Sequence, residues 1–358
     1  MKNIVLNLQL FALTSNGVNA TVASGSMGAL NASGAYNAPN TELSAEMKTF
    51  YDMTLIDEAQ ANLVHDQFGQ KKPIPKGSGK TIEFRKFSPL EKATTPISEG
   101  VTPTGKSLKV SAITATVEQY GDYIVQSDVL ELTALDNTIL EATKLLGNQA
   151  GLTLDTITRN ILQAGTNVTY CPKIAADGSE TAVSSRANLD ITSQLTVDVV
   201  QQVVTKLRAQ NAPTIDGKYV AIIHPYVAYD LMRDPEWIDA HKYATPENIY
   251  AGEIGEIAGC RFVQTTEAKI YKGAGCPEGL AVFGTLFLAS GAYGVTEITG
   301  GGLQTIVKQK GSAGTGDPLD QRSSVGWKAI KTAERLVENY MVRVESCSKR
   351  YSASASAN

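Results

Sequence analysis

The sequence predicts an α+β fold that contains an extended hairpin, a long helix and a mixed α/β domain. Two arms, 81–87 and 106–120, alternate apolar with polar side chains, which is the period of half-exposed strands. Between them, residues 88–105 carry three prolines and two glycines and show neither a helical nor a strand period. A loop of this length inside a compact domain indicates either function or a wrong assignment of the flanking elements. The hairpin is therefore expected to leave its own subunit and lie across a neighbour.

Charge is unevenly distributed along the chain, although its net charge is only −4. Residues 76–110 hold seven basic and three acidic side chains, and residues 122–159 hold six acidic and two basic ones. One interpretation is two solvated faces with ordinary variation in charge. The other is that the basic hairpin of one copy docks on the acidic segment of the next, which would fix the register of the contact. The candidate contact residues are Arg85, Lys86, Lys92, Lys106 and Lys109 with Asp128, Glu131, Asp136 and Glu141 of a neighbour.

A long amphipathic helix is predicted over 133–163, where apolar residues recur every three or four positions. Thr133 and Asp136 have the spacing of a capping box, and Gly165 follows the end of the helix. Gly147 and Gly151 in its interior indicate either close backbone approach or tolerated helix-weakening residues.

The remaining elements are read from the same periodicities. A helix is predicted over 196–210 and a short one from Pro225 to Arg233. Strands are predicted at 218–224, 259–265, 280–289 and 338–345. In the second hairpin arm, the alternation changes phase between Ala112 and Ile113, which predicts a bulge.

These patterns divide the chain into an ordered series of expected parts. The expected parts are a flexible N-terminal arm (1–42), a helical arm (43–75), an extended hairpin (76–120), a peripheral domain (121–195 and 318–350), an axial domain (196–317) and a flexible polar tail (351–358). The first part is uncharged and rich in Ala, Ser, Asn and Gly, so it buries too little apolar area to offset its ordering entropy.

Composition excludes several classes of protein. The four cysteines form no C-x-x-C or zinc pattern, so they are interpreted as reduced and mostly buried, in a cytosolic compartment. Polar residues interrupt the apolar run near Met1, which argues against a signal peptide. No segment approaches the twenty or so apolar residues that span a bilayer.

No enzymatic constellation is found in the sequence. Residues 75–81 end like a phosphate-binding loop, but prolines precede them and a strand follows, so a flexible turn is expected instead. Three histidines lie in different elements without metal-ligand spacing, and no Gly-x-Ser-x-Gly motif occurs. Asp155 is expected to support the surface of the long helix. The sequence thus predicts no catalytic, metal-binding or cofactor-binding residue. A stand-alone α/β enzyme using the loop at 75–81 remains the alternative from a different class.

Short motifs along about three quarters of the chain resemble the major capsid proteins of tailed bacteriophages, in the branch of the N-four-like coat proteins. The motifs are Ser44-Ala-Glu-Met-Lys-Thr-Phe-Tyr51, Leu63-Val-His-Asp-Gln-Phe68, Lys80-Thr-Ile-Glu-Phe-Arg-Lys86, Glu99-Gly-Val-Thr-Pro103, Ala142-Thr-Lys-Leu-Leu146, Gly252-Glu-Ile-Gly-Glu-Ile-Ala-Gly259, Asp317-Pro-Leu-Asp-Gln-Arg322 and Val325-Gly-Trp-Lys328. The resemblance implies the Hong Kong 97-type capsid fold, with an N-terminal arm, an extended loop over 81–117, a spine helix over 133–163 in a peripheral domain, and an α/β axial domain.

The resemblance also implies a function. Pentamers and hexamers of the chain would tile an icosahedral head that encloses double-stranded DNA, with no enzymatic activity, cofactor or membrane. Assembly would take place in the host bacterial cytoplasm, and scaffold, portal and decoration proteins are possible partners. DNA would be held without sequence preference, because the chain carries no basic stripe. The alternative with the same fold is an encapsulin-like shell around a cargo enzyme.

Overall fold

The computed structural model describes most of the chain from Met53 onward. The described residues are 53–358 without 57, 60–62, 78, 88–89, 91, 95, 97–98, 101, 103–104, 134–137, 176, 242–254, 298–300 and 313–316. The expected N-terminal arm (1–42) and the first part of the expected helical arm therefore lie outside the described residues. So does Asp136, which leaves the predicted capping box untested.

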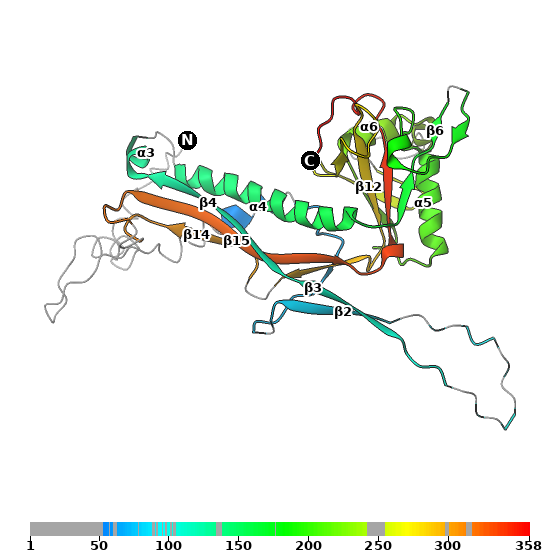
Figure 1. Cartoon of the computed structure of the whole chain (residues 1–358), viewed down its shortest axis with the longest axis horizontal. Coiled ribbons are helices and arrows are strands. Elements are labelled where there is room, and N and C mark those ends of the chain that lie inside the picture. Colours follow the sequence, from blue (N-terminus) through cyan, green and yellow to red (C-terminus); the bar gives the residue numbers. More distant parts are fainter. Residues whose placement is uncertain are drawn as a thin grey trace, which may run out of the picture. The chain divides into compact units, whose positions relative to one another are not determined.

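The chain forms two compact units (Figure 1). The first contains Gly121–Asn148, Leu303–Lys328 and the described residues up to Glu58. The second contains Ala59–Tyr120, Gln149–Gly302 and Ala329–Asn358. Helix α4 (Thr138–Gln163) and strand β15 (Arg322–Arg335) contribute residues to both units.

The first unit contains part of a five-stranded sheet together with helical segments. Strand β15 pairs with β14 (Gln304–Lys308) and with β4 (Glu118–Ser127), and α3 (Asp128–Thr133) follows β4 directly. The side-chain amide of Gln126 in β4 donates to the carbonyl of Thr138, at the start of α4, over 2.9 Å. Leu55 and Leu146 are buried in this unit. The hydrogen bond of Gln126 thus joins β4 to α4.

Gly147 allows a close approach within the first unit. A Cβ at this position would lie 2.8 Å from the carbonyl oxygen of Leu55 and 3.0 Å from Cβ of Glu58. A distance below 3.0 Å to backbone is not tolerated by real Cβ atoms, so only glycine fits without a shift. The prediction of close backbone approach is confirmed at this glycine.

The second unit is built on a seven-stranded mixed sheet. Its order is β5 (Val168–Tyr170), β16 (Met341–Ser346), β12 (Val282–Leu288), β8 (Tyr219–Ile223), β10 (Cys260–Gln264) and β9 (Glu256–Ile257), with β11 (Ile270–Tyr271) paired to β12. Every residue of β8 and β12 is buried, as expected for central strands with near-continuous apolar sequence. Helix α5 (Val197–Ala209) packs its valines into the same core.

Shorter elements complete the second unit. Helices α6 (Pro225–Met232) and α7 (Pro235–His241) follow β8, and β13 (Tyr293–Glu297) pairs with β15 and with β1 (Gln70–Lys71). Strands β6 (Lys173–Ile174) and β7 (Glu180–Thr181) form a small hairpin. Two 3₁₀ turns lie at Arg186–Asn188 and Glu338–Tyr340.

Most elements predicted in the second unit are confirmed, with small shifts of their ends. The helix at 196–210 is α5, with the Thr196 side chain accepting from the amide of Val199, and the strands at 218–224, 259–265 and 280–289 are β8, β10 and β12. The last strand begins at Met341 rather than at residue 338, because Glu338–Tyr340 forms a 3₁₀ turn. Cys171, Cys260 and Cys347 are buried and free, in agreement with their interpretation as small core residues.

The last eight residues differ from the expected flexible tail, because they pack against the second unit. Ser352 is buried; its side-chain oxygen accepts from the amide of Ser348 over 2.7 Å, and its carbonyl accepts from the amide of Ala281 over 2.8 Å. The side-chain amide of Asn358 donates to the carbonyl of Ala268 over 3.0 Å. A polar composition does not reveal this docking, because the polar groups are satisfied by backbone atoms far away in sequence.

Candidate assembly surfaces

The predicted hairpin is present and forms its own two-stranded sheet (Figure 1). Strands β2 (Thr81–Phe87) and β3 (Val110–Thr116) pair antiparallel from Thr81 opposite Thr116 to Phe87 opposite Val110. The pairing is continuous over the change of phase at Ala112 and Ile113, so the predicted bulge is wrong. The break falls later, at Val117, which separates β3 from β4.

The root of the hairpin is anchored in the second unit. Phe84 is only 5% exposed, and a Cβ on Gly294 of β13 would lie 2.7 Å from its ring. The Lys72 ammonium lies 5.5 Å from the centroid of the same ring and donates to the carbonyl of Glu83 over 3.3 Å. Burial of an aromatic ring beneath a glycine fixes the direction in which the two strands leave the unit.

Burial is lost toward the tip of the hairpin. Leu90 is 60% exposed, Leu108 67% and Val110 50%, and most of β3 is exposed. Single exposed apolar residues are ordinary, but three on a projecting ribbon without a core beneath it resemble a binding surface. The anchored root and the uncovered apolar end together define a ribbon suited to contact with another molecule.

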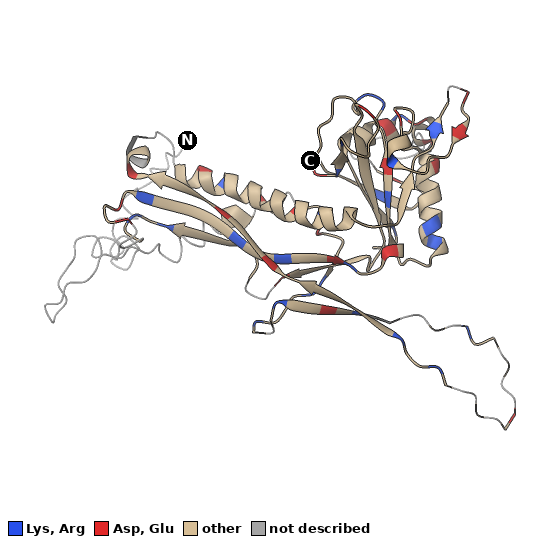
Figure 2. Cartoon of the chain, in the orientation of Figure 1, with Lys and Arg blue, Asp and Glu red and all other residues tan. Residues whose placement is uncertain are grey.

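The basic candidates lie along this ribbon (Figure 2). Arg85 is exposed, and its guanidinium lies 3.8 Å from the carboxylate of Glu83 on the same strand. Lys92, Lys106 and Lys109 are also exposed. Lys86 lies in β2, but its side chain is outside the described residues. The distance to Glu83 is long for an ion pair, so Arg85 remains able to contact a further carboxylate.

The acidic candidates lie in the first unit, and two of them have local contacts. Asp128 is partly buried at the start of α3, where its carboxylate accepts from the amide of Val129 over 2.8 Å. Glu141 is exposed on α4 and pairs with Lys144 over 3.0 Å. Glu131 belongs to α3 with its side chain outside the described residues, and Asp136 is not described. The basic and the acidic candidates belong to different units of the chain, and a contact between them in neighbouring copies stays a prediction.

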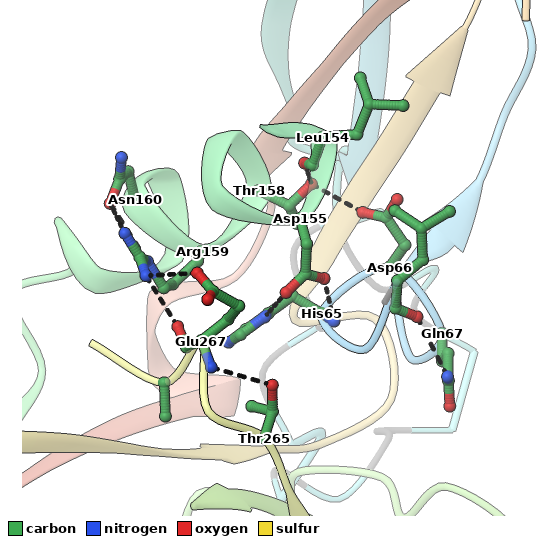
Figure 3. Close-up of polar contacts among 12 residues, drawn as sticks. His65, Asp66, Gln67, Leu154, Asp155, Thr158, Arg159, Asn160, Thr265 and Glu267 are labelled. Carbon is green, nitrogen blue, oxygen red and sulfur yellow. Dashed lines mark hydrogen bonds and ion pairs between the residues drawn. The ribbon is translucent and has the colours of Figure 1, made fainter. Parts of the chain in front are cut away.

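Asp155 contradicts the expectation that it supports the surface of the long helix. Its carboxylate is completely buried in the second unit, where Oδ1 accepts from the backbone amide of His65 over 2.7 Å and Oδ2 lies 2.6 Å from His65 Nδ1 (Figure 3). The period of α4 placed Asp155 next to apolar neighbours, and only the tertiary contact with the turn at His65 shows why a carboxylate is buried there.

The pair belongs to a larger buried polar network in the second unit (Figure 3). Asp66 accepts from the hydroxyl of Thr158 over 2.6 Å and forms an ion pair with Lys331. Arg159 is buried and donates to the carbonyl of Glu267 over 2.8 Å. Burial lowers the pKa of Arg159, because the charged guanidinium is desolvated. These bonds tie α4 to the turn at His65 and Asp66 and to the loop after β10.

This network changes which charges of the segment 122–159 face solvent. Asp155 and Arg159 are both buried, and removing one charge of each sign leaves the net charge of the segment at −4. The proposed electrostatic complement of the hairpin is therefore unchanged. The network is buried within the second unit, and no sequence motif would have indicated it.

A further exposed surface lies on the sheet of the first unit. Tyr123 and Val125 of β4 and Ile306 of β14 are exposed, while the neighbouring Gln126 is buried on the opposite face. Tyr123 lies over Gly326 of β15, where a Cβ would come within 2.7 Å of Tyr123 Cβ. A shallow groove of about 280 Å³ runs between these strands. This open sheet face is a second candidate for contact between copies.

The structure also describes most of the segment that ends like a phosphate-binding loop. The segment 75–81 is a turn with positive φ at Gly77 and Gly79 that leads into β2, so no helix N-terminus faces a phosphate there. No group of three metal-ligating side chains is present in the described part of the chain. Among the described helices, none is long and apolar enough to span a membrane.

A long helix, a projecting hairpin and an α/β unit on one chain define the class of shell-forming proteins with the Hong Kong 97-type capsid fold. The family model for phage capsid protein matches residues 110–337, so the chain belongs to the phage capsid protein family. As a member of this family, it is a bacteriophage major capsid protein, which is a structural protein of the viral capsid. No curated protein matches the chain.

Solved structures show the same fold at low sequence identity. The capsid of Ralstonia phage GP4 matches with a TM-score of 0.63 and 15% identity over 80% of this chain and 89% of that one. The capsid of cyanophage P-SCSP1u matches with a TM-score of 0.61 and 14% identity over 79% and 87%. The cyanophage Pam1 capsid matches with a TM-score of 0.61 and 13% identity over 89% and 98%. These matches show the fold of phage capsid subunits over most of the chain.

Proposed function

We propose that this capsid protein assembles into pentamers and hexamers that tile an icosahedral head and enclose double-stranded DNA. The observation that carries the proposal is the hairpin, with Phe84 buried at its root and Leu90, Leu108 and Val110 exposed toward its tip. These exposed side chains can be buried only by another molecule. In a shell built from this chain, the molecule next to each hairpin is a neighbouring copy. Fold similarity to phage capsids supports self-association.

The hairpin of one copy docks on the first unit of the next. Basic residues Arg85, Lys86, Lys92, Lys106 and Lys109 face Asp128, Glu131, Asp136 and Glu141 of that neighbour. Opposite charge guides the encounter and excludes wrong registers, whereas the exposed apolar side chains supply the buried area. Charge and apolar contact thus have separate roles in one interface.

Such a contact joins two different surfaces, so it is heterologous. A head-to-tail contact of this kind closes into a ring when the rotation between copies allows it, and rings of five and six then tile a closed container. The domain of residues 196–317 occupies the positions nearest the five-fold and six-fold axes, and residues 121–195 with 318–350 form the periphery. Scaffold, portal and decoration proteins join this assembly in the host cytoplasm.

Electron microscopy of the purified full chain tests the proposal, beside a variant in which residues 88–105 are replaced by a short turn. Closed shells or capsomer rings from the full chain, and none from a variant with the same circular dichroism spectrum, are the expected result. Equal assembly by both proteins would overturn the role of the hairpin. Shells that retain an enzyme rather than DNA when purified from cells would favour the encapsulin-like alternative.

A further inference from the structure

Aromatic rings form a continuous stack from the core of the second unit to its surface. The ring centroid of Phe283 in β12 lies 5.2 Å from that of His224, which lies 4.7 Å from Tyr226. Tyr226 stacks on Tyr351 with centroids 4.2 Å apart and planes inclined by 12°. Because the inner rings are buried, the outer tyrosines are held in fixed positions.

Next to this stack, one tyrosine holds two guanidinium groups. Arg233 and Arg350 lie 5.6 and 5.8 Å from the ring centroid of Tyr229, and Arg233 also donates to the Tyr229 hydroxyl over 3.2 Å. Tyr229 packs edge-on against Tyr351 at 6.0 Å. A guanidinium held over an aromatic ring loses less conformational freedom when it binds a ligand than a free one would.

The cations of this surface are exposed and face no carboxylate partner in the described part of the chain. Arg233, Lys349 and Arg350 are exposed, and no ion pair is formed by any of them among those residues. The two nearby carboxylates are directed at backbone amides: Asp230 accepts from Lys349 N over 3.1 Å, and Asp234 accepts from Val197 N over 2.9 Å. The positive heads of the three side chains therefore remain available to a ligand.

We propose that this tyrosine–arginine patch, formed by Tyr226, Tyr229, Arg233, Lys349, Arg350 and Tyr351, binds the phosphate backbone of duplex DNA. Guanidinium groups match phosphate oxygens in two-point contacts, an ammonium adds a further charge, and tyrosine hydroxyls can donate to the same oxygens. No base edge needs to be reached, so binding is independent of sequence. The inference rests on the proposed function, because it names the surface that meets the enclosed DNA.

The proposal is tested by removing the three cations and measuring the affinity for DNA. Fluorescence anisotropy of a labelled 30-base-pair duplex is measured with the full chain at several salt concentrations. In the triple variant Arg233→Ser, Lys349→Ser, Arg350→Ser, we expect roughly tenfold or weaker binding and a slope of log affinity against log salt that is smaller by about 2–3, since each phosphate contact contributes about 0.9. The matched control is Lys173→Ser with Lys218→Ser, two cations of the same unit that already pair with Asp190 and Glu256.

A second variant separates positioning from charge. Tyr229→Leu keeps all three cations but removes the ring beneath Arg233 and Arg350, so we expect weaker binding with an almost unchanged salt slope. Thermal melting confirms that each variant is folded. Unchanged affinity and slope in the triple variant, relative to the control, would overturn the proposal.

Shell formation by the same variants is followed by electron microscopy. Triple-variant protein that still binds DNA normally but forms no shells would assign the patch to a contact between copies and overturn DNA binding. If the wild-type protein forms shells and the triple variant binds DNA as tightly as the wild type, the proposal for the patch is wrong and the proposed function is unaffected. If the wild-type protein never forms shells but binds DNA, and the triple variant loses that binding, the patch stands and the proposed function fails.

Discussion

Asp155 and His65 form a completely buried polar pair, although they lie 90 positions apart in the sequence. The carboxylate accepts from the backbone amide of His65 and also contacts its ring nitrogen Nδ1 at 2.6 Å. One aspartate thereby fixes both the backbone and the side chain of the turn that precedes the hairpin. The pair thus connects α4 to the segment from which the hairpin starts.

Replacing Asp155 by Ala is expected to lower the free energy of unfolding by about 3–5 kcal/mol, because it leaves buried polar groups of His65 without a partner. The measurement is urea denaturation followed by circular dichroism. Glu141→Ala is the matched control on the same helix, since its ion pair with Lys144 is exposed and is worth at most about 1 kcal/mol. An equal decrease in the free energy of unfolding in the two variants would show that the buried pair stabilises the protein no more than the exposed one.

Reversing the charge of Arg85 and Lys86 to Glu is expected to prevent assembly and leave the subunit folded and soluble. The exposed Arg85 makes only a long contact with Glu83, so little stability is lost. Electron microscopy and light scattering measure assembly, and circular dichroism measures folding. Normal shells from this double variant would contradict the electrostatic docking.

A compensating change makes this prediction sharper. Asp128→Lys together with Glu141→Lys, in the protein that carries Arg85→Glu and Lys86→Glu, reverses both proposed surfaces. Restored assembly is expected, because complementarity rather than a particular sign guides the contact. Lys218→Glu serves as a control for a general effect of added negative charge.

Replacing Leu90 and Leu108 by Ser is expected to raise the protein concentration needed for assembly. Each of these exposed side chains contributes roughly 1.5–3 kcal/mol when it becomes fully buried in an interface, and partial burial contributes less. The critical concentration is measured by light scattering. Ile191→Ser is the control, because Ile191 is exposed in the second unit away from the hairpin sequence. The same change in the control variant would argue against a specific contact at the tip.

Stability of the second unit is expected to fall as the pH decreases from about 6.5 toward 4. Burial lowers the pKa of His224 to about 4, because the charged imidazole would be desolvated. Nδ1 of the neutral ring accepts from the amide of Tyr226 at the start of α6. The unfolded chain binds a proton near its ordinary pKa of about 6.5, whereas the folded chain does not, so protons favour unfolding in this window.

The measurement is the melting temperature between pH 4 and 8. In His224→Asn, which retains an acceptor at the helix start but does not titrate here, the pH dependence should be shallower. An identical pH profile in both proteins would show that His224 does not carry the effect. Above pH 7 the two proteins should differ little in slope.

The periodicity of apolar residues was sufficient to predict those elements whose side chains follow one regular pattern of burial. The apolar run of β8, the valine stripe of α5 and the alternation in β2 each match one burial pattern, so their periods indicated them correctly. The hairpin was also predictable, because a proline-rich loop of that length cannot belong to a compact core. Its basic charge is likewise a property of sequence alone.

Other features depended on partners distant in sequence. The long strand β15 was not predicted, since its alternation is weak and its three partner strands lie elsewhere in the chain. The prediction of a bulge in β3 was wrong. Strand β3 pairs continuously with β2, because an exposed ribbon tolerates a change in which face carries the apolar side chains. The packing of Ser352 and Asn358 was not visible in their polar composition.

The sequence by itself determined that this protein has a long helix, an α/β unit and a projecting basic hairpin, and short motifs indicated its family. Tertiary structure alone decided that Asp155 is buried against His65, that Gly147 admits the backbone of Leu55, and that Tyr229 holds Arg233 and Arg350. The physical reason is the range of the interactions. Periodicity reports the local distribution of apolar and polar side chains, whereas satisfaction of buried polar groups and close packing depend on residues brought together only by folding.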